Sequence, residues 1–403
     1  MQETAPAFNP HESGYRWVVM ALAATSFTMA FVSRFAWPPL VSVVTPVMNI
    51  NTTEAMAYMT AFYIGYVATQ IPGGILADRF GPKIVLSACL ALQGLGTMGI
   101  GFTENYQVGF ILRIICGLGA GCVYSSCLKA VVAWFTPAQR GMAIGVVMTS
   151  PTIGVAIPNY LMPVLNSSMG WQGAFKSVGV ALIVLAFVLF ALMRDVKNTA
   201  AGPRKSFMVG LKYVCSNRNI LMISLAGFSC VWCQIGFGSV ANSYMSSSLG
   251  FSVEEAGKIM GTYGLIGIAM PTLAGYLSGK MPKNKKAMII ACHIAWIGAF
   301  LVFGQVASLT STLLVACFIG LTISFANPIY SIIIADNAGP EWAATAGGVG
   351  NAIFQVGALL SPLVIGMARD ATGTHVWTWW ILAIGSLFGI LATALVKHSE
   401  PVK

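Results

Sequence analysis

One arginine, Arg34, lies where a charged side chain is costly. It falls within the apolar stretch 17–40, which is long enough to cross a bilayer. A central arginine costs about 2.5–3.5 kcal/mol on membrane-insertion scales, so it normally faces a cavity. The helical period places it beside Phe27, Phe31 and Trp37, which offer no side-chain oxygen. We expect the guanidinium to bind the anionic group of a ligand, in the bidentate geometry that it offers carboxylates.

Other polar side chains within apolar stretches are candidates to bind the rest of that ligand. Tyr63 and Tyr66 share one face of a predicted helix, and Asn351 and Gln355 share another at a spacing of four residues. The predicted substrate-binding residues are Arg34, Tyr63, Tyr66, Tyr124, Gln234, Tyr330, Asn351 and Gln355. Intramembrane hydroxyl and amide groups commonly bond neighbouring helices at about 0.6 kcal/mol each, so all of these except Arg34 have a structural alternative.

Arg113 is the second arginine within an apolar stretch, and it is a possible coupling residue. It either joins Arg34 at the ligand or makes structural hydrogen bonds. The twelve acidic residues lie in loops, tails or helix ends, so no carboxylate is expected in mid-membrane. This distribution argues against cationic substrates, which usually need a buried carboxylate. The sequence has no nucleophile–base set, metal-ligand spacing or phosphate loop, so we expect no enzyme, no cofactor and no metal.

The composition shows which elements must position these side chains. The chain is 57% hydrophobic and 8% charged, with a mean hydropathy of +0.77, which is typical of an integral membrane protein. Non-alternating apolar stretches predict helices rather than barrel strands. We therefore expect an all-α protein with twelve transmembrane helices, at about residues 17–40, 55–77, 84–102, 107–128, 142–164, 174–193, 219–244, 255–277, 287–306, 309–334, 343–367 and 375–396.

Lysine and arginine are distributed unevenly between the predicted loops. With the N-terminus inside, seventeen of the 22 fall in inner loops and tails and three in outer loops. This asymmetry predicts a multi-pass protein of the cell inner membrane with both termini cytoplasmic. It also accounts for the net charge of +10, so we expect no nucleic-acid partner. The nine cysteines lie in or beside apolar spans, which argues against disulfides.

The sequence repeats itself at an offset of 203 residues. Leu22 falls on Leu225 and Pro137 on Pro340, whereas the position of Arg34 is taken by Phe237. The second half therefore offers an apolar wall rather than a second charge. The predicted domains are an N-terminal six-helix bundle (1–193), a basic cytoplasmic linker (194–218) and a C-terminal six-helix bundle (219–403).

Four local motifs resemble those of the major facilitator superfamily. They are GILADRFGPK at 74–83, RIICGLGA at 113–120, WFTPAQRG at 134–141 and GMARDATG at 366–373. Within the superfamily the chain resembles organic-anion carriers of the anion:cation symporter and oxalate/formate exchanger kind. The resemblance implies two six-helix pseudo-repeats around a central cavity and transport by alternating access. We expect a monomer in the lipid bilayer.

The resemblance also implies an inner gate formed by Asp78, Arg79 and Arg140. Asp78 would pair with Arg140 and face a helix N-terminus, which favours an anion by about 0.3–1 kcal/mol. In the second half Gly279 and Ala343 take the places of Asp78 and Arg140, so charges would hold the gate on one side only. The alternative is that these charges are solvated and only mark the topology.

The expected function is secondary active transport of a small organic anion, a monocarboxylate or a hydroxy or aromatic carboxylate. Moving an anion against an inside-negative potential costs about 2.3 kcal/mol per charge and 100 mV. The partner is therefore either protons, carried by the substrate, His293 or Glu54, or a counter-anion in exchange. Alternatives are an inorganic oxyanion or dicarboxylate exchanger that uses Arg34 and Arg113 together, an exporter of amphipathic compounds, and a transporter-like sensor.

Overall fold

The computed structural model describes residues 10–196 and 207–397, which contain helices and turns but no strand. The first half comprises α1 (Tyr15–Phe35), η1 (Pro38–Leu40), α2 (Val41–Met48), α3 (Thr52–Phe80), α4 (Pro82–Ile100), α5 (Tyr106–Gly121), α6 (Val123–Trp134), α7 (Pro137–Met148) and α8 (Ser150–Leu192). The rest comprises α9 (Phe207–Ser216), α10 (Arg218–Ser248), α11 (Val253–Ile266), α12 (Met270–Lys280), η2 (Pro282–Asn284), α13 (Lys285–Phe303), α14 (Leu309–Thr372) and α15 (Val376–Ala394). The predicted all-α class is confirmed.

Two of the helices each contain two membrane crossings. Gly170 divides α8 and Gly339 divides α14, with φ angles of 72° and 70° that favour glycine. Within the described residues, nine helical stretches are long and apolar enough to span a membrane. Dividing the stretch that contains α8 at Gly170 gives a tenth. The less apolar α3 and the shorter pair α11 and α12 complete the twelve expected crossings.

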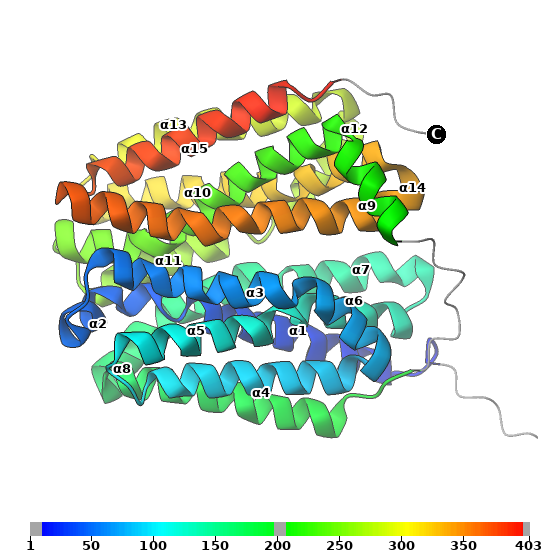
Figure 1. Ribbon diagram of the computed structural model, residues 1–403, viewed down its shortest axis with the longest axis horizontal. Helices are drawn as coiled ribbons and strands as arrows, with labels where there is room; N and C mark the ends of the chain where they lie inside the picture. Colours follow the sequence, from blue (N-terminus) through cyan, green and yellow to red (C-terminus); the bar gives the residue numbers. More distant parts are fainter. Residues whose placement is uncertain (1–9, 197–206, 398–403) are drawn as a thin grey trace, which may run out of the picture.

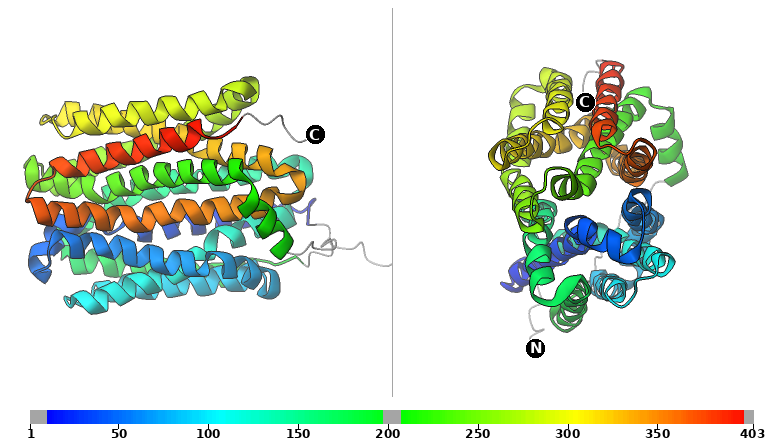
Figure 2. Two further views of the ribbon diagram at one scale, coloured as in Figure 1. Left: turned by 45° about the horizontal axis from the view of Figure 1, so that its top comes forward. Right: turned by 90° about the vertical axis from the view of Figure 1, so that its left-hand side faces the viewer.

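The internal repeat is visible in where the helices begin. Helices α1 and α10 begin at Tyr15 and Arg218, and α4 and α13 at Pro82 and Lys285, each pair 203 residues apart. Helices α1 to α6 lie together in the lower part of Figure 1, and α10, α13 and α15 in the upper part. The end-on view in Figure 2 shows these two groups side by side with their helices roughly parallel. The chain is thus built from two six-helix pseudo-repeats.

The limits of the predicted domains stay a prediction. Residues 197–206 of the predicted linker, and both chain ends (1–9 and 398–403), lie outside the described residues. The remainder of the linker contains α9, which the sequence did not lead us to expect. This helix packs on α14, where the rings of Tyr213 and Trp342 have centroids 6.1 Å apart.

The prolines after Arg34 end the first helix early. Helix α1 stops at Phe35, and a short 3-10 turn over Pro38–Leu40 leads into α2. Trp37, which we expected on one face with Arg34, lies just past the end of α1. The Trp37 indole instead packs on Tyr58, with centroids 4.4 Å apart, and donates a hydrogen bond to the Ala55 carbonyl at 2.8 Å.

We call the end of the molecule where α1 begins and α15 ends the inner end, and the opposite end, which holds α2, the outer end (Figure 1). At the outer end the two halves are in contact. The Asp370 carboxylate of α14 accepts hydrogen bonds from the backbone nitrogens of Thr52 and Thr53, at 3.1 and 2.7 Å. It also accepts one from the Thr53 hydroxyl, at 2.6 Å, and so caps α3 from across the interface.

Glycines toward the inner end lack the close neighbours found at the outer end. At the outer end, a Cβ added to Gly366 of α14 would lie 2.8 Å from Thr53 Cα. At the inner end, a Cβ added to Gly74, Gly145 or Gly348 would meet no atom within 4 Å in the part of the chain that the structure describes. The halves therefore meet at the outer end, whereas these three glycines toward the inner end face open space.

Candidate anion-binding site

The Arg34 side chain lies in a cage of aromatic rings. It is only 5% exposed, and its guanidinium carbon lies 4.3 Å from the ring centre of Phe31 and 4.5 Å from that of Tyr66. The rings of Phe62 and Tyr63 complete the cage, at 5.1 and 5.5 Å. Each such contact stabilises a cation by about 0.5–2 kcal/mol. The rings thus offset part of the cost of burying the charge without supplying a counter-charge.

The same cage leaves polar atoms without partners. Within the described residues, Arg34 Nε and the Tyr63 hydroxyl are buried without a well-formed hydrogen bond, although the hydroxyl lies within reach of the Arg34 guanidinium. A buried polar group without a partner costs about 1–3 kcal/mol, and more if it is charged. A ligand oxygen that accepts from Arg34 would remove this cost, and a carboxylate or sulfonate would also supply the missing negative charge. The cage therefore has the chemistry of an anion site.

Arg113 holds the end of α1 beneath this site. It is fully buried, and its guanidinium donates to the carbonyls of Ser33, Arg34 and Tyr58 at 3.2, 3.0 and 3.1 Å. In an unbroken helix the Arg34 carbonyl would accept from the backbone nitrogen of residue 38, but Pro38 has no N–H. Arg113 supplies the missing donor. Its guanidinium thus fixes the backbone from which Arg34 projects.

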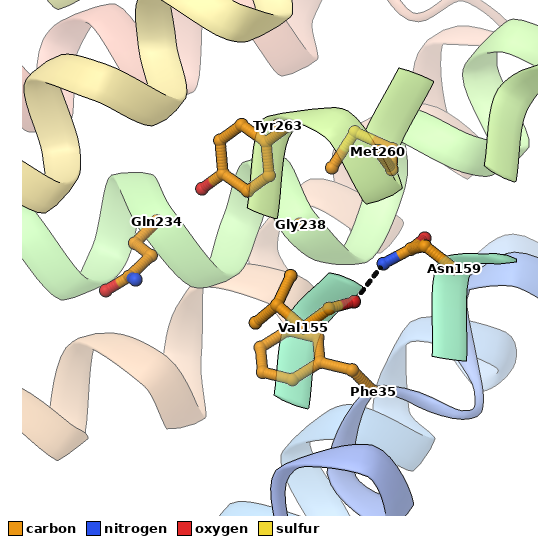
Figure 3. A pocket seen from close by; sticks show the side chains of 7 residues that line it. All are labelled: Phe35, Val155, Asn159, Gln234, Gly238, Met260 and Tyr263. Atoms are coloured by element: carbon orange, nitrogen blue, oxygen red, sulfur yellow. Dashed lines mark hydrogen bonds between the residues drawn. The ribbon is translucent and has the colours of Figure 1, made fainter. Parts of the chain in front are cut away.

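A small pocket lies between the two halves beside this site. Figure 3 shows its lining side chains, which come from α1 and α8 on one side and from α10 and α11 on the other. They are Phe35, Val155, Asn159, Gln234, Gly238, Met260 and Tyr263. Phe35 directly follows Arg34, and a Cβ added to Gly238 of α10 would lie 3.5 Å from the Phe35 ring. The pocket and the aromatic cage are therefore joined through the end of α1.

The structure brings some of the predicted substrate-binding residues together. Tyr63 and Tyr66 join Arg34 in the cage, and Gln234 lines the pocket. Tyr124 is 38% exposed and lies beyond the cage, with its ring centroid 5.7 Å from that of Phe27.

The other predicted residues lie in the second half of the chain. On α14, Gln355 donates to Asn351 Oδ1 at 3.3 Å, so this pair does face one direction. Tyr330 is fully buried and bonds to His293 rather than lining the pocket. Asn159 was missed, although an amide within a predicted span is the same signal that singled out Gln234.

Of the residues predicted to gate the inner end, Asp78 and Arg79 lie in the last turn of α3 and Arg140 lies in the first turn of α7. Asp78 forms an ion pair with Lys129 at 3.1 Å, a partner that the sequence did not indicate. Arg140 Nε donates to the Phe135 carbonyl at 3.1 Å, and Arg79 is exposed. The pairing of Asp78 with Arg140 stays a prediction for another conformation.

The chain matches the Major Facilitator Superfamily over residues 22–362, and it belongs to that family. It is 24% identical to a probable sulfoacetate transporter of Cupriavidus necator, over 96% of each chain. It is 20% identical to a hexuronate transporter of Bacillus subtilis over 88% of each, and 24% identical to a probable L-galactonate transporter of Escherichia coli over 81% and 77%. These proteins are transporters rather than enzymes, as expected for this chain.

Solved structures confirm the fold. A bacterial homologue of the human lysosomal transporter Spinster, in an inward-facing and unoccupied conformation, superimposes with a TM-score of 0.81. The match covers 95% of this chain and 98% of that one at 17% identity. The fold of twelve transmembrane helices is therefore that of the superfamily, and the chain is a multi-pass membrane protein.

Proposed function

We propose that this protein transports a small organic anion that binds through a single carboxylate or sulfonate at Arg34. The observation that carries the proposal is the buried Arg34 guanidinium, which has aromatic rings around it, an unpartnered Nε and no ion pair with a carboxylate among the described residues. The relatives support the class, since their names specify sulfoacetate, hexuronate and L-galactonate. All three of these molecules are organic acids.

The single available cation favours a ligand with one strongly anionic end. The three hydrogen bonds from Arg113 to backbone carbonyls hold that guanidinium in a structural role. This favours a monoanion over an oxyanion or dicarboxylate that needs both arginines. The amides Gln234 and Asn159 and the hydroxyl of Tyr263 line the adjoining pocket and would suit hydroxyl groups on the rest of the ligand. A hydroxylated monocarboxylate would match the chemistry of both parts.

Transport would proceed by alternating access between the two halves. We place the inner end at the cytoplasmic face of the inner membrane, because lysine and arginine concentrate there. The described conformation, in which Asp370 joins the halves at the outer end, would then alternate with one in which the Asp370 cap breaks. Asp78 and Arg140 would pair in that second conformation, with residues 1–193 and 219–403 as the moving bodies.

A thermal-shift panel on the purified protein tests the anion class. Small carboxylates, sulfonates and organic cations are compared on wild type, Arg34→Ala and the matched control Arg218→Ala, which removes a guanidinium from the inner end of α10. A ligand at 100 times its Kd stabilises the folded protein by about 2.7 kcal/mol. We expect an anion to stabilise wild type and the control but not Arg34→Ala. Stabilisation by cations, or an anion effect that survives in Arg34→Ala, contradicts the proposal.

A further inference from the structure

Gly238 lies in the wall of the pocket between the two halves, and Phe35 lines the same pocket from the other half (Figure 3). Gly238 stands well inside α10 (Arg218–Ser248), with helical residues on both sides. Glycine in the interior of a helix is destabilising relative to alanine, because it loses more conformational freedom on folding. A glycine at this position therefore needs a reason in packing or in function.

Helix packing explains the other glycines of α10 but not Gly238. A Cβ added to Gly227 would overlap a ring of α14, and one added to Gly236 would lie 2.8 Å from a side chain of α15. Neither position can take a methyl group unless a neighbour moves. Apart from the backbone of its own helix, a Cβ added to Gly238 would meet one atom of the described residues within 4 Å, on the Phe35 ring at 3.5 Å. That is an ordinary van der Waals distance, so an alanine would fit here.

The internal repeat relates Gly238 to the residue that it faces. At the offset of 203 residues, Gly238 corresponds to Phe35, so the two repeat-related positions meet at the pocket. One half places a phenyl ring there, and the other half places no side chain. An alanine would already avoid a clash with that ring, so steric fit to Phe35 does not account for the glycine. The remaining reason is space in the pocket itself.

We propose that Gly238 determines how long an anion the pocket accepts, because its lack of a side chain leaves room for the uncharged part of the ligand. The inference rests on the proposed anion transport, in which Arg34 binds the charged end. Phe35 directly follows Arg34 and lines the pocket, so a longer anion held at Arg34 extends past Phe35 toward Gly238. Gln234 lies about one turn from Gly238 on α10 and would bond a hydroxyl group on that part of the ligand.

A methyl group at position 238 would therefore affect long anions and spare short ones. It would occupy the space beside Phe35 and clash with any ligand atom that lies there. A steric clash of this kind is one way in which a binding site rejects one ligand and retains another. One methylene more or less in a tight apolar pocket changes discrimination between ligands by about 10–200-fold. The loss of affinity should thus grow with the length of the anion.

Isothermal titration calorimetry with four straight-chain hydroxy acids tests this proposal. The acids are glycolate, glycerate, threonate and gluconate, with two, three, four and six carbons. We expect Gly238→Ala to weaken binding of the longest acid that the wild type binds by at least tenfold, while the shortest stays within twofold. The double variant Phe35→Leu/Gly238→Ala should recover most of the lost affinity, because the smaller side chain at position 35 returns the space.

The matched control is Gly298→Ala, which makes the same change at an exposed position of α13. A Cβ added there would meet no atom within 4 Å in the part of the chain that the structure describes. Because alanine favours a helix, both alanine variants should melt without ligand at or above the wild-type temperature. Gly298→Ala should bind all four acids as the wild type does.

Four outcomes would overturn the inference. Gly238→Ala could keep the wild-type affinity for the longest acid, or it could lose short and long acids equally, which would indicate a packing role. The double variant could fail to recover the loss. The wild type could also bind glycolate as tightly as every longer acid, since the ligand would then gain nothing from the pocket.

A further variant decides if Gly238→Ala does not fold. Phe35→Leu widens the pocket from the other side, so the affinity for the longest acid should rise relative to that for glycolate. An unchanged ratio would refute a role of this contact in selecting ligand length. Failure of every carboxylate and sulfonate to stabilise the wild type in the thermal-shift panel would instead refute the proposed transport of anions.

Discussion

The first helices of the two halves occupy the same place in the repeat but end differently. Helix α1 breaks after Phe35, where Pro38 and Pro39 follow, whereas α10 continues without a break to Ser248. At an offset of 203 residues, Pro38 corresponds to Ala241 and Arg113 to Ala316. The first half therefore has both the proline that leaves a carbonyl without a donor and the arginine that supplies a donor. The second half has neither.

The side chains at the matching positions follow the same division. Arg34 lies in its aromatic cage beside the pocket, whereas Phe237 is fully buried among other rings. Its centroid lies 5.0 Å from that of Phe303 and 5.4 Å from that of Tyr263. Under the proposed function, one half thus supplies the cation, the helix break and the supporting arginine together, and the other half supplies neutral polar groups.

The most severe test of this division is Arg34→Gln, which removes the charge and keeps a polar side chain. We expect anion affinity to fall by about 2–5 kcal/mol, as when one partner of a buried charge pair is removed. Uptake of radiolabelled anion should be lost, while thermal stability without ligand stays equal or rises because a buried charge is gone. The control is Arg218→Gln, and retained uptake in Arg34→Gln would place the anion site elsewhere.

Arg113→Lys tests whether the second arginine acts through the first. A lysine keeps the charge but cannot reach three carbonyls at once, so the end of α1 should lose its fixed geometry. We expect anion affinity to fall by about 1–3 kcal/mol, the range for residues that share one network. Isothermal titration calorimetry on Arg113→Lys, Arg34→Gln and the double variant measures this. Additive losses would contradict a positioning role, because the two residues would then act independently.

Phe237→Leu tests the opposite side of the comparison. Helix α10 places this ring within an apolar cluster, so its loss should lower stability by about 1 kcal/mol through poorer packing. Anion affinity should not change, because the second half is expected to supply no cation at this position. A thermal melt and a binding titration on the same sample separate the two effects. A tenfold loss of affinity without loss of stability would show that the symmetry-related position also contacts the ligand.

The two halves also differ in how they contribute to the outer contact. Helix α14 supplies Asp370 and α3 supplies its free N–H groups, so Asp370→Asn should weaken the contact by about 0.3–1 kcal/mol. Spin labels at Thr103→Cys and Gln305→Cys, in a Cys215→Ser background, report the distance between the outer loops. We expect Asp370→Asn to show a larger share of long distances between the two spin labels than the protein with Asp370 intact. Asp195→Asn is the control, because Asp195 accepts from the Lys83 backbone within one half, and it should leave the distances unchanged.

The sequence was sufficient for the fold and for the burial of Arg34 within the first crossing, because both depend on local rules. Apolar stretches of the required length predicted the crossings, and a charge within the first of them indicated a cavity. The same rules could not place Tyr330 or Lys129. Whether the hydroxyl of Tyr330 faces the pocket or His293 depends on how α13 and α14 pack, and Lys129 meets Asp78 because α3 and α6 lie side by side. Helical periodicity within one segment does not indicate which residues of distant segments pair with each other.

The finest test concerns one hydroxyl in the aromatic cage. Tyr63→Phe keeps the ring that faces Arg34 and removes a buried oxygen that makes no well-formed hydrogen bond within the described residues and lies within reach of the guanidinium. Stability should stay equal or rise slightly, since the variant no longer buries a hydroxyl without a well-formed hydrogen bond. If the hydroxyl bonds the anion, the free energy of anion binding should weaken by about 0.5–1.5 kcal/mol, the net contribution of one hydrogen bond.

The control is Tyr58→Phe. The Tyr58 hydroxyl donates to the Tyr106 carbonyl at 3.0 Å, so this variant should lose stability instead of anion affinity. Unchanged affinity in Tyr63→Phe would mean that Arg34 binds the anion without the Tyr63 hydroxyl. Tyr63 would then contribute only its ring to the cage.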